Sequence, residues 1–440
     1  MQHSSQIKLS GMLDTMPAEG LLPLGAGWLL VALGLIVLSS FPLVPPVDVL
    51  DGGTTTRGFI EFGLILAGLA LLLICLKAQG SFSFDLKSPP FLIVTVFTAW
   101  SIVSSIWSPN PVLTIAKSAE LWCIAVAALV FVTLAARAGF TNGKLETILG
   151  LSMVAVLCGL IVANIYYWGV PLPTTGDAAL PLELMDEEAS PERPRLILAY
   201  QHPLLTGDLL ALAAISLFVS GLRKTWKAIL ITGVAVLMWL ADARGPTGGM
   251  IVSMVALAFL KLRKNDVRAI AVMLAISIAL AVALFFQNHL PADMSALMSD
   301  DVPTLNSRTD LWAKAVSHVL DQPLLGTGYY ASRYLLVKDF PWGGHAHNSF
   351  LEVQLTTGVI GLLMLCAFVG YVFKEIFTTR NALLLGVTLY CLIQGTLNPL
   401  LFYPGLAMFV ITIAVLNAGL SNGDVKRVES DRESNFHSER

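Results

Sequence analysis

The chain has 440 residues, of which 55% are hydrophobic and 13% are charged, and its formal net charge is −3. A soluble domain is about 25% charged, so this composition excludes soluble, disordered, collagen-like and disulfide-scaffold classes. A net charge so close to zero gives no reason to expect a nucleic-acid partner. The apolar fraction equals about 242 residues, close to twelve spans of about 20 residues each. We therefore predict an all-α polytopic membrane protein.

Apolar runs bounded by charges, Pro or Gly predict twelve transmembrane helices, nine within residues 22–287 and three within 349–419. The first six spans are 22–44, 59–77, 90–108, 113–135, 147–169 and 203–222. The others are 226–241, 246–262, 267–287, 349–373, 381–397 and 401–419. Residues 226–262 are divided in two because the corner Ala243-Arg244-Gly245-Pro246 breaks a helix.

The distribution of Lys and Arg predicts the orientation of the spans. With both termini in the cytoplasm, eighteen Lys and Arg fall in cytoplasmic segments and eight in outer segments. Residues 1–21 then form a cytoplasmic segment without a cleavable signal, and 420–440 form a disordered cytoplasmic tail. The long outer segments are 170–202 and 288–348. We expect a multi-pass membrane protein with both termini in the cytoplasm and two long polar segments on the outer side.

Polar and thiol side chains inside the spans are few. All five cysteines fall within spans without ligand spacing, which is typical of small packing residues. Lys117 and Glu120 lie three residues apart in the fourth span, so they can neutralise each other. Lys117 is nevertheless kept as a candidate substrate-binding residue, because charges inside a membrane commonly mark functional sites.

The larger outer loop, 288–348, lies between spans nine and ten and is predicted to be partly helical. Asn306 or Ser307 can cap a helix there, and Pro323, Gly326 and Gly328 end it. Its apolar face would be formed by Leu311, Trp312, Ala315, Val316, Val319 and Leu320. The helix either rests on the outer leaflet or forms a lid over a site at the membrane surface.

Two histidines, His345 and His347, lie between glycines and Asn348 where this loop re-enters the bilayer. Spacing of i and i+2 suits a metal poorly, and no nearby Cys or carboxylate pair completes a ligand set. A neutral imidazole is better suited to taking a proton from a hydroxyl, since its ordinary pKa is near 6.5.

Three of the arginines in outer segments are candidates for the site: Arg195 before the sixth span, Arg244 after the seventh, and Arg308 in the loop helix. Arginine presents a planar fork that matches phosphate oxygens. Each could instead anchor its helix to lipid headgroups. Together with the histidines, they predict a pocket for an anionic phosphate beside a hydroxyl acceptor.

Short motifs in a fixed order resemble the O-antigen ligase and polymerase superfamily of bacterial envelope glycosyltransferases. They are Asp242–Gly245, Ser307–Trp312, Pro323–Gly328, His345–Glu352 and Thr357–Gly361. The resemblance covers about 230–372, roughly a third of the chain.

That resemblance implies a protein of a bacterial inner membrane whose site faces the periplasm. It also implies a donor glycan on undecaprenyl diphosphate and transfer to an acceptor hydroxyl, such as lipid A–core or another glycan, without metal or cofactor. It implies catalytic roles for Arg244, Arg308 and His347. Arg195, His345 and Asn348 are expected to bind substrate. The chemistry agrees, because guanidinium groups stabilise the diphosphate charge that develops and a base accepts the acceptor's proton.

Three alternatives stay open. A polymerase of the same superfamily would extend the glycan itself, and a protein O-oligosaccharyltransferase would use Ser or Thr of an exported protein. The absence of a matched pair of Arg-to-Gly motifs in the two outer loops slightly favours a ligase. A secondary transporter would also fit twelve spans, but it would usually show internal repeats with broken helices and polar residues near the midplane.

Overall fold

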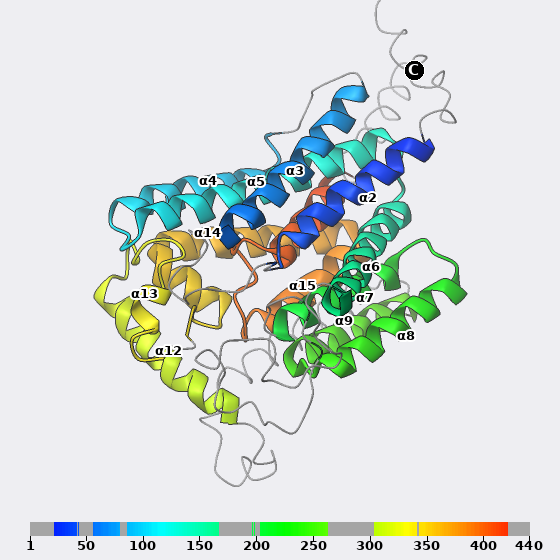
Figure 1. The fold of residues 1–440 in the computed structure, drawn as a ribbon. Helices are drawn as coiled ribbons and strands as arrows, with labels where there is room; N and C mark the ends of the chain where they lie inside the picture. The colour runs from blue at the N-terminus through cyan, green and yellow to red at the C-terminus, as the bar shows by residue number, and fades with distance from the viewer. Residues whose placement is uncertain are drawn as a thin grey trace, which may run out of the picture.

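The computed structural model describes residues 22–41, 43, 56–79, 86–166, 196, 198, 203–262, 303–340 and 343–420 (Figure 1). These residues form helices and connections, with no strand among them. The helices are α2 (Leu22–Leu38), α3 (Thr56–Ala78), α4 (Pro89–Val103), η2 (Ser104–Ile106), α5 (Pro111–Arg137), α6 (Asn142–Tyr166) and α7 (Pro203–Val219). Then come α8 (Lys224–Ala241), α9 (Arg244–Leu262), α12 (Pro303–Asp321), α13 (Arg333–Leu336), α14 (Ser349–Thr379), α15 (Ala382–Gln394) and a C-terminal helix, Leu406–Leu420.

Six of these helices are long and apolar enough to cross a membrane, and five shorter apolar helices accompany them. The chain is therefore a polytopic helical membrane protein, as the composition predicts. Every predicted span within the described residues coincides with an apolar helix, with differences at the ends. The span predicted at 267–287 and nearly all of the loop 170–202 lie outside the described residues, so twelve spans stays a prediction.

Caps and turn residues set several helix ends. Asn110 caps α5 by accepting a hydrogen bond from the N–H of Leu113, and Asn381 caps α15 in the same way. The predicted break between the spans at 226–241 and 246–262 is confirmed: α8 ends at Ala241 with Asp242 as its C-cap, whose φ of 47° is left-handed, and α9 starts at Arg244. Pro246 then lies in the first turn of α9, where a missing N–H costs nothing.

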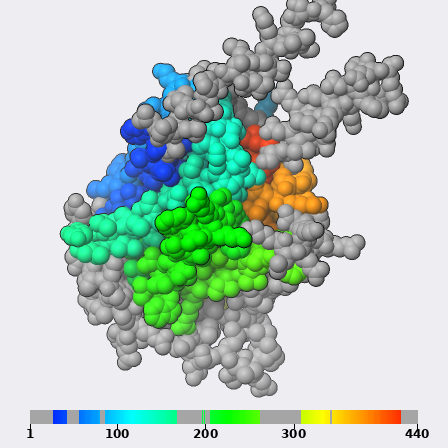
Figure 2. All heavy atoms as spheres, turned by 90° about the vertical axis from the view of Figure 1, so that its right-hand side faces the viewer, coloured from blue at the N-terminus to red at the C-terminus, as the bar shows by residue number. Residues whose placement is uncertain are grey.

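The helices pack in two groups around buried centres. In one, α5 lies between α3 and α4, and α14 packs against α4; in the other, α7 contacts α6, α8, α9 and α15. Every residue of α15 from Leu383 to Gln394 is buried, so this helix lies inside the bundle. By contrast, α8 buries only three of its side chains and lies on the face shown in Figure 2 (green). Exposed apolar residues there would face lipid.

The long helix α14 is interrupted at Gly358, whose φ of 69° is left-handed. The loop Pro323–Gly328 fills the break, and its backbone N–H groups donate to the carbonyl oxygens of Leu355 and Thr356 at 3.0 and 2.9 Å. A Cβ at Gly326 would lie 2.5 Å from the nitrogen of Gly358, so only glycine fits. Thus two motifs that the sequence separates by about thirty residues complete each other's hydrogen bonds.

Several predicted boundaries are wrong. The span predicted at 349–373 continues to Thr379 and is broken at Gly358, because the inserted loop supplies the lost helix bonds. The loop helix α12 starts at Pro303, ahead of the predicted caps Asn306 and Ser307.

The predicted apolar face of α12 is correct for four residues and wrong for two. Its side chains Leu311, Trp312, Ala315 and Val319 are buried against the first turns of α14 and against α13. Val316 and Leu320 are exposed instead. The helix thus docks on protein through a narrow stripe, and it lies at one edge of the bundle in Figure 1.

Candidate active site

Several connections meet at one end of the bundle, called the loop end below. They are 104–110, 242–244, 323–340 with 343–348, and 395–403. The indole nitrogen of Trp107 donates to the carbonyl of Gly326 at 3.1 Å. The segment 394–398 contacts both Gly245 and Asn348: a Cβ at Gly245 would lie 2.7 Å from Gln394 Oε1, and Asn348 Nδ2 lies 3.4 Å from the Thr396 carbonyl oxygen.

The segment Gly343–Asn348, called the histidine segment, is held through Ala346. The N–H of Ala346 donates to Glu352 Oε2 at 2.7 Å, and its carbonyl accepts from Trp312 Nε1 at 2.8 Å. The N–H of His347 donates to His345 Nδ1 at 3.2 Å, and the two imidazole centres are 4.1 Å apart. Both imidazoles are half-buried, whereas Ala346 is fully buried. The backbone of the segment is therefore fixed by hydrogen bonds, while the side chains of the two predicted site histidines remain partly exposed.

Asn348 ends the histidine segment and caps α14. Its Oδ1 accepts from the N–H groups of Phe350 and Leu351 at 2.9 and 3.0 Å. Together with the contact to Thr396, these bonds occupy its amide, and the side chain is buried. The structure gives Asn348 a capping role that the residue type itself signals. Substrate binding by Asn348 stays a prediction.

The structure places the predicted arginines differently. Arg308 is half-buried on α12, one helical turn before Trp312, whose indole holds Ala346. Arg244 is largely exposed at the start of α9, with Nε 3.9 Å from Asp242 Oδ1. Arg195 lies outside the described residues. The next residue, Leu196, donates its N–H to the carbonyl of Leu240 at 2.8 Å, in the last turn of α8.

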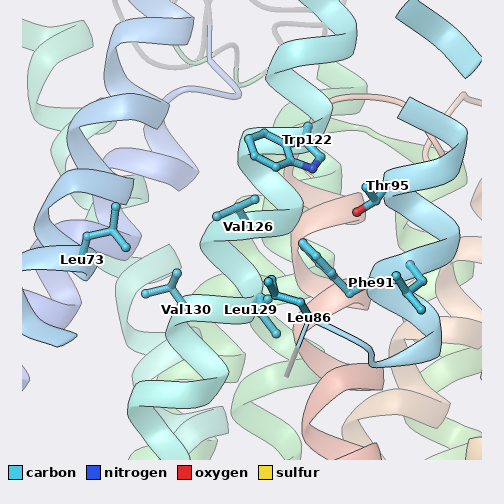
Figure 3. A pocket seen from close by; sticks show the side chains of 9 residues that line it. Leu73, Leu86, Phe91, Thr95, Trp122, Val126, Leu129 and Val130 are labelled. Atoms are coloured by element: carbon cyan, nitrogen blue, oxygen red, sulfur yellow. The ribbon is translucent and has the colours of Figure 1, made fainter. Parts of the chain in front are cut away.

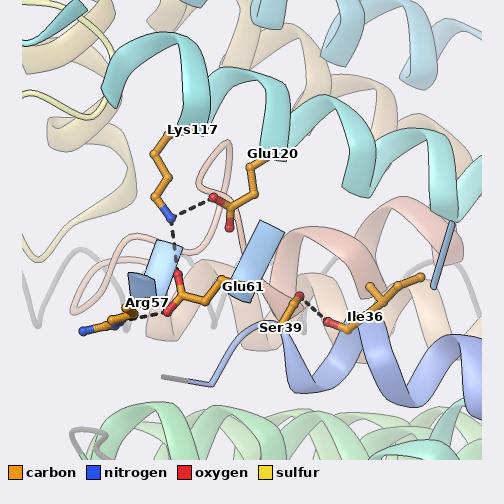
Figure 4. A network of polar contacts seen from close by, with 6 residues as sticks. All are labelled: Ile36, Ser39, Arg57, Glu61, Lys117 and Glu120. Atoms are coloured by element: carbon orange, nitrogen blue, oxygen red, sulfur yellow. Dashed lines mark hydrogen bonds and ion pairs between the residues drawn. The ribbon is translucent and has the colours of Figure 1, made fainter. Parts of the chain in front are cut away.

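Lys117 takes part in a buried ion network, shown in Figure 4. Its Nζ lies 2.7 Å from Glu120 Oε2 and 3.5 Å from Glu61 Oε2, and Glu61 also pairs with Arg57 at 2.8 Å. The predicted pairing of Lys117 with Glu120 is therefore confirmed. Glu61 was missed because it comes from α3, far away in sequence. A role of Lys117 in substrate binding stays untested by this geometry.

Sequence reasoning also missed an aromatic and cationic cluster between Lys117 and His345. The Tyr330 ring lies 5.4 Å from Lys117 Nζ, 4.6 Å from Arg333 Cζ and 4.9 Å from the Tyr403 ring. The Tyr403 ring lies edge-on to His345 at 6.1 Å. A charged Arg333 beside two tyrosines was the available sequence signal.

Backbone strain concentrates at the loop end. Of the five described non-glycine residues with positive φ, four lie there: Asp242, Tyr330, His347 and Phe402. Such conformations persist only where the surroundings hold them, and they cluster at functional sites. The fifth, Arg380, only ends a helix. One of the four is the predicted site residue His347, and another is Tyr330 of the aromatic cluster. Asp242 lies two residues before Arg244, and Phe402 directly precedes Tyr403.

A buried carboxylate lies beneath these connections. Asp208 on α7 accepts a hydrogen bond from the Tyr390 hydroxyl on α15, and Asn398 Nδ2 lies 3.4 Å from its Oδ2. Its neighbour Gly207 packs so tightly on the α8–α9 corner that a Cβ would lie 2.7 Å from that of Ala243. Because Ser349 Oγ donates to the Asn398 carbonyl at 3.2 Å, this network ties the corner at Arg244 to the start of α14.

An apolar pocket of about 490 Å³ lies between α3, α4 and α5 (Figure 3). Its lining is hydrocarbon apart from single polar atoms, and its residues are Leu73, Leu86, Phe91, Leu92, Thr95, Trp122, Val126, Leu129 and Val130.

Among the described residues, no group of three or more His, Cys, Asp or Glu could hold a metal ion. Independence of metal stays a prediction.

Fold and site together define a multi-pass membrane protein with a fixed histidine segment at one end of its helix bundle. Residues 209–366 match the family model described as O-Antigen ligase, and this stretch holds Arg244, Arg308 and the histidine segment. A protein of Rickettsia conorii that bears the name of a polysaccharide ligase is 25% identical over 115 residues, 24% of this chain and 28% of its own. The exopolysaccharide production protein ExoQ of Rhizobium meliloti is 31% identical over 96 residues, 19% and 22% of the respective chains.

The matched segments thus span less than a third of the length of these relatives. The names of these relatives agree with the description of the family model. The resemblance to the O-antigen ligase superfamily is therefore confirmed.

Proposed function

We propose that this protein is a membrane glycosyltransferase that moves a glycan from undecaprenyl diphosphate to an acceptor hydroxyl, lipid A–core, at the periplasmic face of the inner membrane. The observation that carries the proposal is the fixed histidine segment, bound through Trp312 to the helix that bears Arg308. Both lie within the residues that match the O-Antigen ligase model. Membrane lipids surround the protein, and the donor's hydrocarbon chain would share their environment.

The proposed reaction exchanges one bond for another at the anomeric carbon of the donor sugar. The acceptor oxygen bonds to that carbon while the bond to the phosphate oxygen breaks, and undecaprenyl diphosphate leaves with the electron pair. The acceptor proton passes to His347, with His345 as the second candidate. Arg308 and Arg244 stabilise the charge that develops on the diphosphate. A half-buried imidazole is suited to this proton transfer near neutral pH.

The proposed topology has twelve spans with both termini in the cytoplasm and the large loop, 288–348, in the periplasm. The excess of Lys and Arg in the segments assigned to the cytoplasm supports it. The loop end then faces the periplasm, where a lipid-linked donor and lipid A–core would meet. No metal or nucleotide sugar takes part in this proposal.

An acceptor competition tests the proposed function. The purified protein in proteoliposomes would receive a radiolabelled glycan on undecaprenyl diphosphate, with lipid A–core, free glycan or an exported protein offered in turn. We expect label on lipid A–core. Label on none of the acceptors, or flux of the donor across the bilayer without transfer, would contradict a glycosyltransferase.

A polymerase is the second candidate, and the similarity to an exopolysaccharide production protein favours it. In the same assay, a polymerase would lengthen the lipid-linked glycan itself and leave lipid A–core unlabelled. A protein O-oligosaccharyltransferase would label the exported protein. The acceptor that becomes labelled therefore separates the three.

A further inference from the structure

Glu352, in the first turn of α14, is a buried acid whose two oxygens serve two different segments. Oε1 accepts from the Ser332 hydroxyl at 2.6 Å, and Oε2 accepts from the N–H of Ala346 at 2.7 Å. The side chain is only 4% exposed. A carboxylate this deeply buried must be hydrogen-bonded, and both of its oxygens are.

Both backbone polar groups of Ala346, its N–H and its carbonyl, are hydrogen-bonded to side chains. Glu352 holds the peptide that joins His345 to Ala346, and Trp312 holds the peptide that joins Ala346 to His347 through the 2.8 Å bond to the carbonyl. Each histidine is bonded to one of these two fixed peptide units. Their orientation therefore fixes the direction in which both imidazoles leave the backbone.

His347 needs such support because its φ of 49° is left-handed, a conformation that a residue with a Cβ avoids. Asn348, the next residue, is also fixed, since its side chain caps α14. The histidine segment is thus bounded on one side by a helix cap and held in the middle by Glu352 and Trp312.

We propose that Glu352 is a positioning residue which, with Trp312, sets the geometry of His345 and His347 for transfer. This rests on the proposed function. Glu352 acts through hydrogen bonds to the backbone and touches no substrate. Its contribution should therefore depend on the shape and acceptor capacity of its side chain more than on its charge.

Two substitutions separate these properties. Glu352→Gln can keep both contacts, because its amide oxygen accepts from Ala346 and its amide nitrogen donates to Ser332 Oγ. Glu352→Leu keeps the volume and loses both contacts. We expect kcat to fall about 100-fold in E352L with the KM for the lipid-linked donor unchanged, and to fall less than about 5-fold in E352Q. Trp312→Phe, which loses the indole donor and part of the ring, should resemble E352L.

A matched control is Glu375→Leu, which removes another buried acid of α14, far from the histidine segment. Its kcat should equal that of the unmodified protein. E352L with full kcat would overturn the proposal. So would E352Q with as little activity as E352L, because the charge would then matter more than the contacts.

Hydrogen exchange of the peptide 343–349 tests the positioning without any assay of transfer. The Ala346 amide should exchange slowly in the unmodified protein, in E352Q and in E375L, and fast in E352L. If no acceptor is labelled by the unmodified protein, the proposed function fails and this exchange still decides the role of Glu352. Equal exchange in E352L and the unmodified protein would overturn it.

Discussion

The histidine segment and the ion network around Lys117 are both built from buried polar groups, yet they differ in what they leave available. In the network, Lys117 and Arg57 face Glu61 and Glu120, so two positive and two negative groups satisfy one another inside the bundle. In the histidine segment, the buried contacts go to the backbone of Ala346, and the side chains of His345 and His347 remain partly exposed. The comparison teaches that buried charge alone does not mark a functional site. A site also needs a reactive side chain that the buried contacts hold in place and leave accessible, as they do for the two histidines.

The largest effect expected from this comparison is at His347. His347→Ala should lower glycan transfer about 1000-fold, because a base positioned at the acceptor proton is worth two to four orders of magnitude. Initial rates in proteoliposomes measure it. His318→Ala, a histidine on α12 that lies 4.0 Å from Asp321, is the matched control and should transfer normally. Equal rates for H347A and H318A would contradict the assignment.

Substitutions in the ion network around Lys117 should lower the stability of the protein. Lys117→Met leaves two buried carboxylates without their shared cation, so the free energy of unfolding should fall by about 3 kcal/mol. Thermal unfolding in detergent measures it. The triple variant K117M/E61Q/E120Q, which also removes both carboxylate charges and leaves only the partly exposed Arg57 charged, should recover most of that loss. If the stable triple variant transfers glycan slowly with a raised KM, Lys117 also binds substrate, and the contrast between the two regions is wrong.

Arg308 should show a somewhat smaller effect. Arg308→Lys keeps the charge and loses the planar fork, and transfer should fall about 100-fold with the fold intact. Arg223→Lys, at the start of α8, provides the same substitution away from the loop end. Full activity of R308K would mean that Arg308 supplies only charge or anchors its helix at the membrane surface.

The smallest effect separates capping from binding at Asn348. Asn348→Ser retains a capping hydroxyl, whereas Asn348→Ala loses the cap and about 1 kcal/mol of stability. Asn381→Ser and Asn381→Ala repeat the pair at α15. If Asn348 only caps, N348S should transfer at the normal rate. A large loss in N348S at normal stability would show that its amide contacts substrate.

The sequence predicts elements that depend on local pattern. Apolar runs place the helices, and the Arg-Gly-Pro corner places the break between α8 and α9. The Lys117–Glu120 pair is readable because both lie on one helix. The exposure of Val316 and Leu320 was not predictable, because it depends on the angle at which α12 docks on α14.

Contacts between distant segments account for the rest. Glu61 joins the network from another helix, and Glu352 and Trp312 meet at Ala346 from opposite sides of the histidine segment in sequence. The close packing of Gly326 against Gly358 could not be predicted from either motif alone. Periodicity reports which side of a helix is apolar, but not which backbone group a buried acid will meet.

The most direct test of the central claim is the stoichiometry of one transfer reaction. Proteoliposomes holding the protein, a labelled glycan on undecaprenyl diphosphate and lipid A–core would be followed in the presence of a metal chelator. We predict one free undecaprenyl diphosphate for each glycan that appears on lipid A–core, with both products lost in the H347A variant. Donor consumed without a glycosylated acceptor, or products formed equally by H347A, would contradict the account.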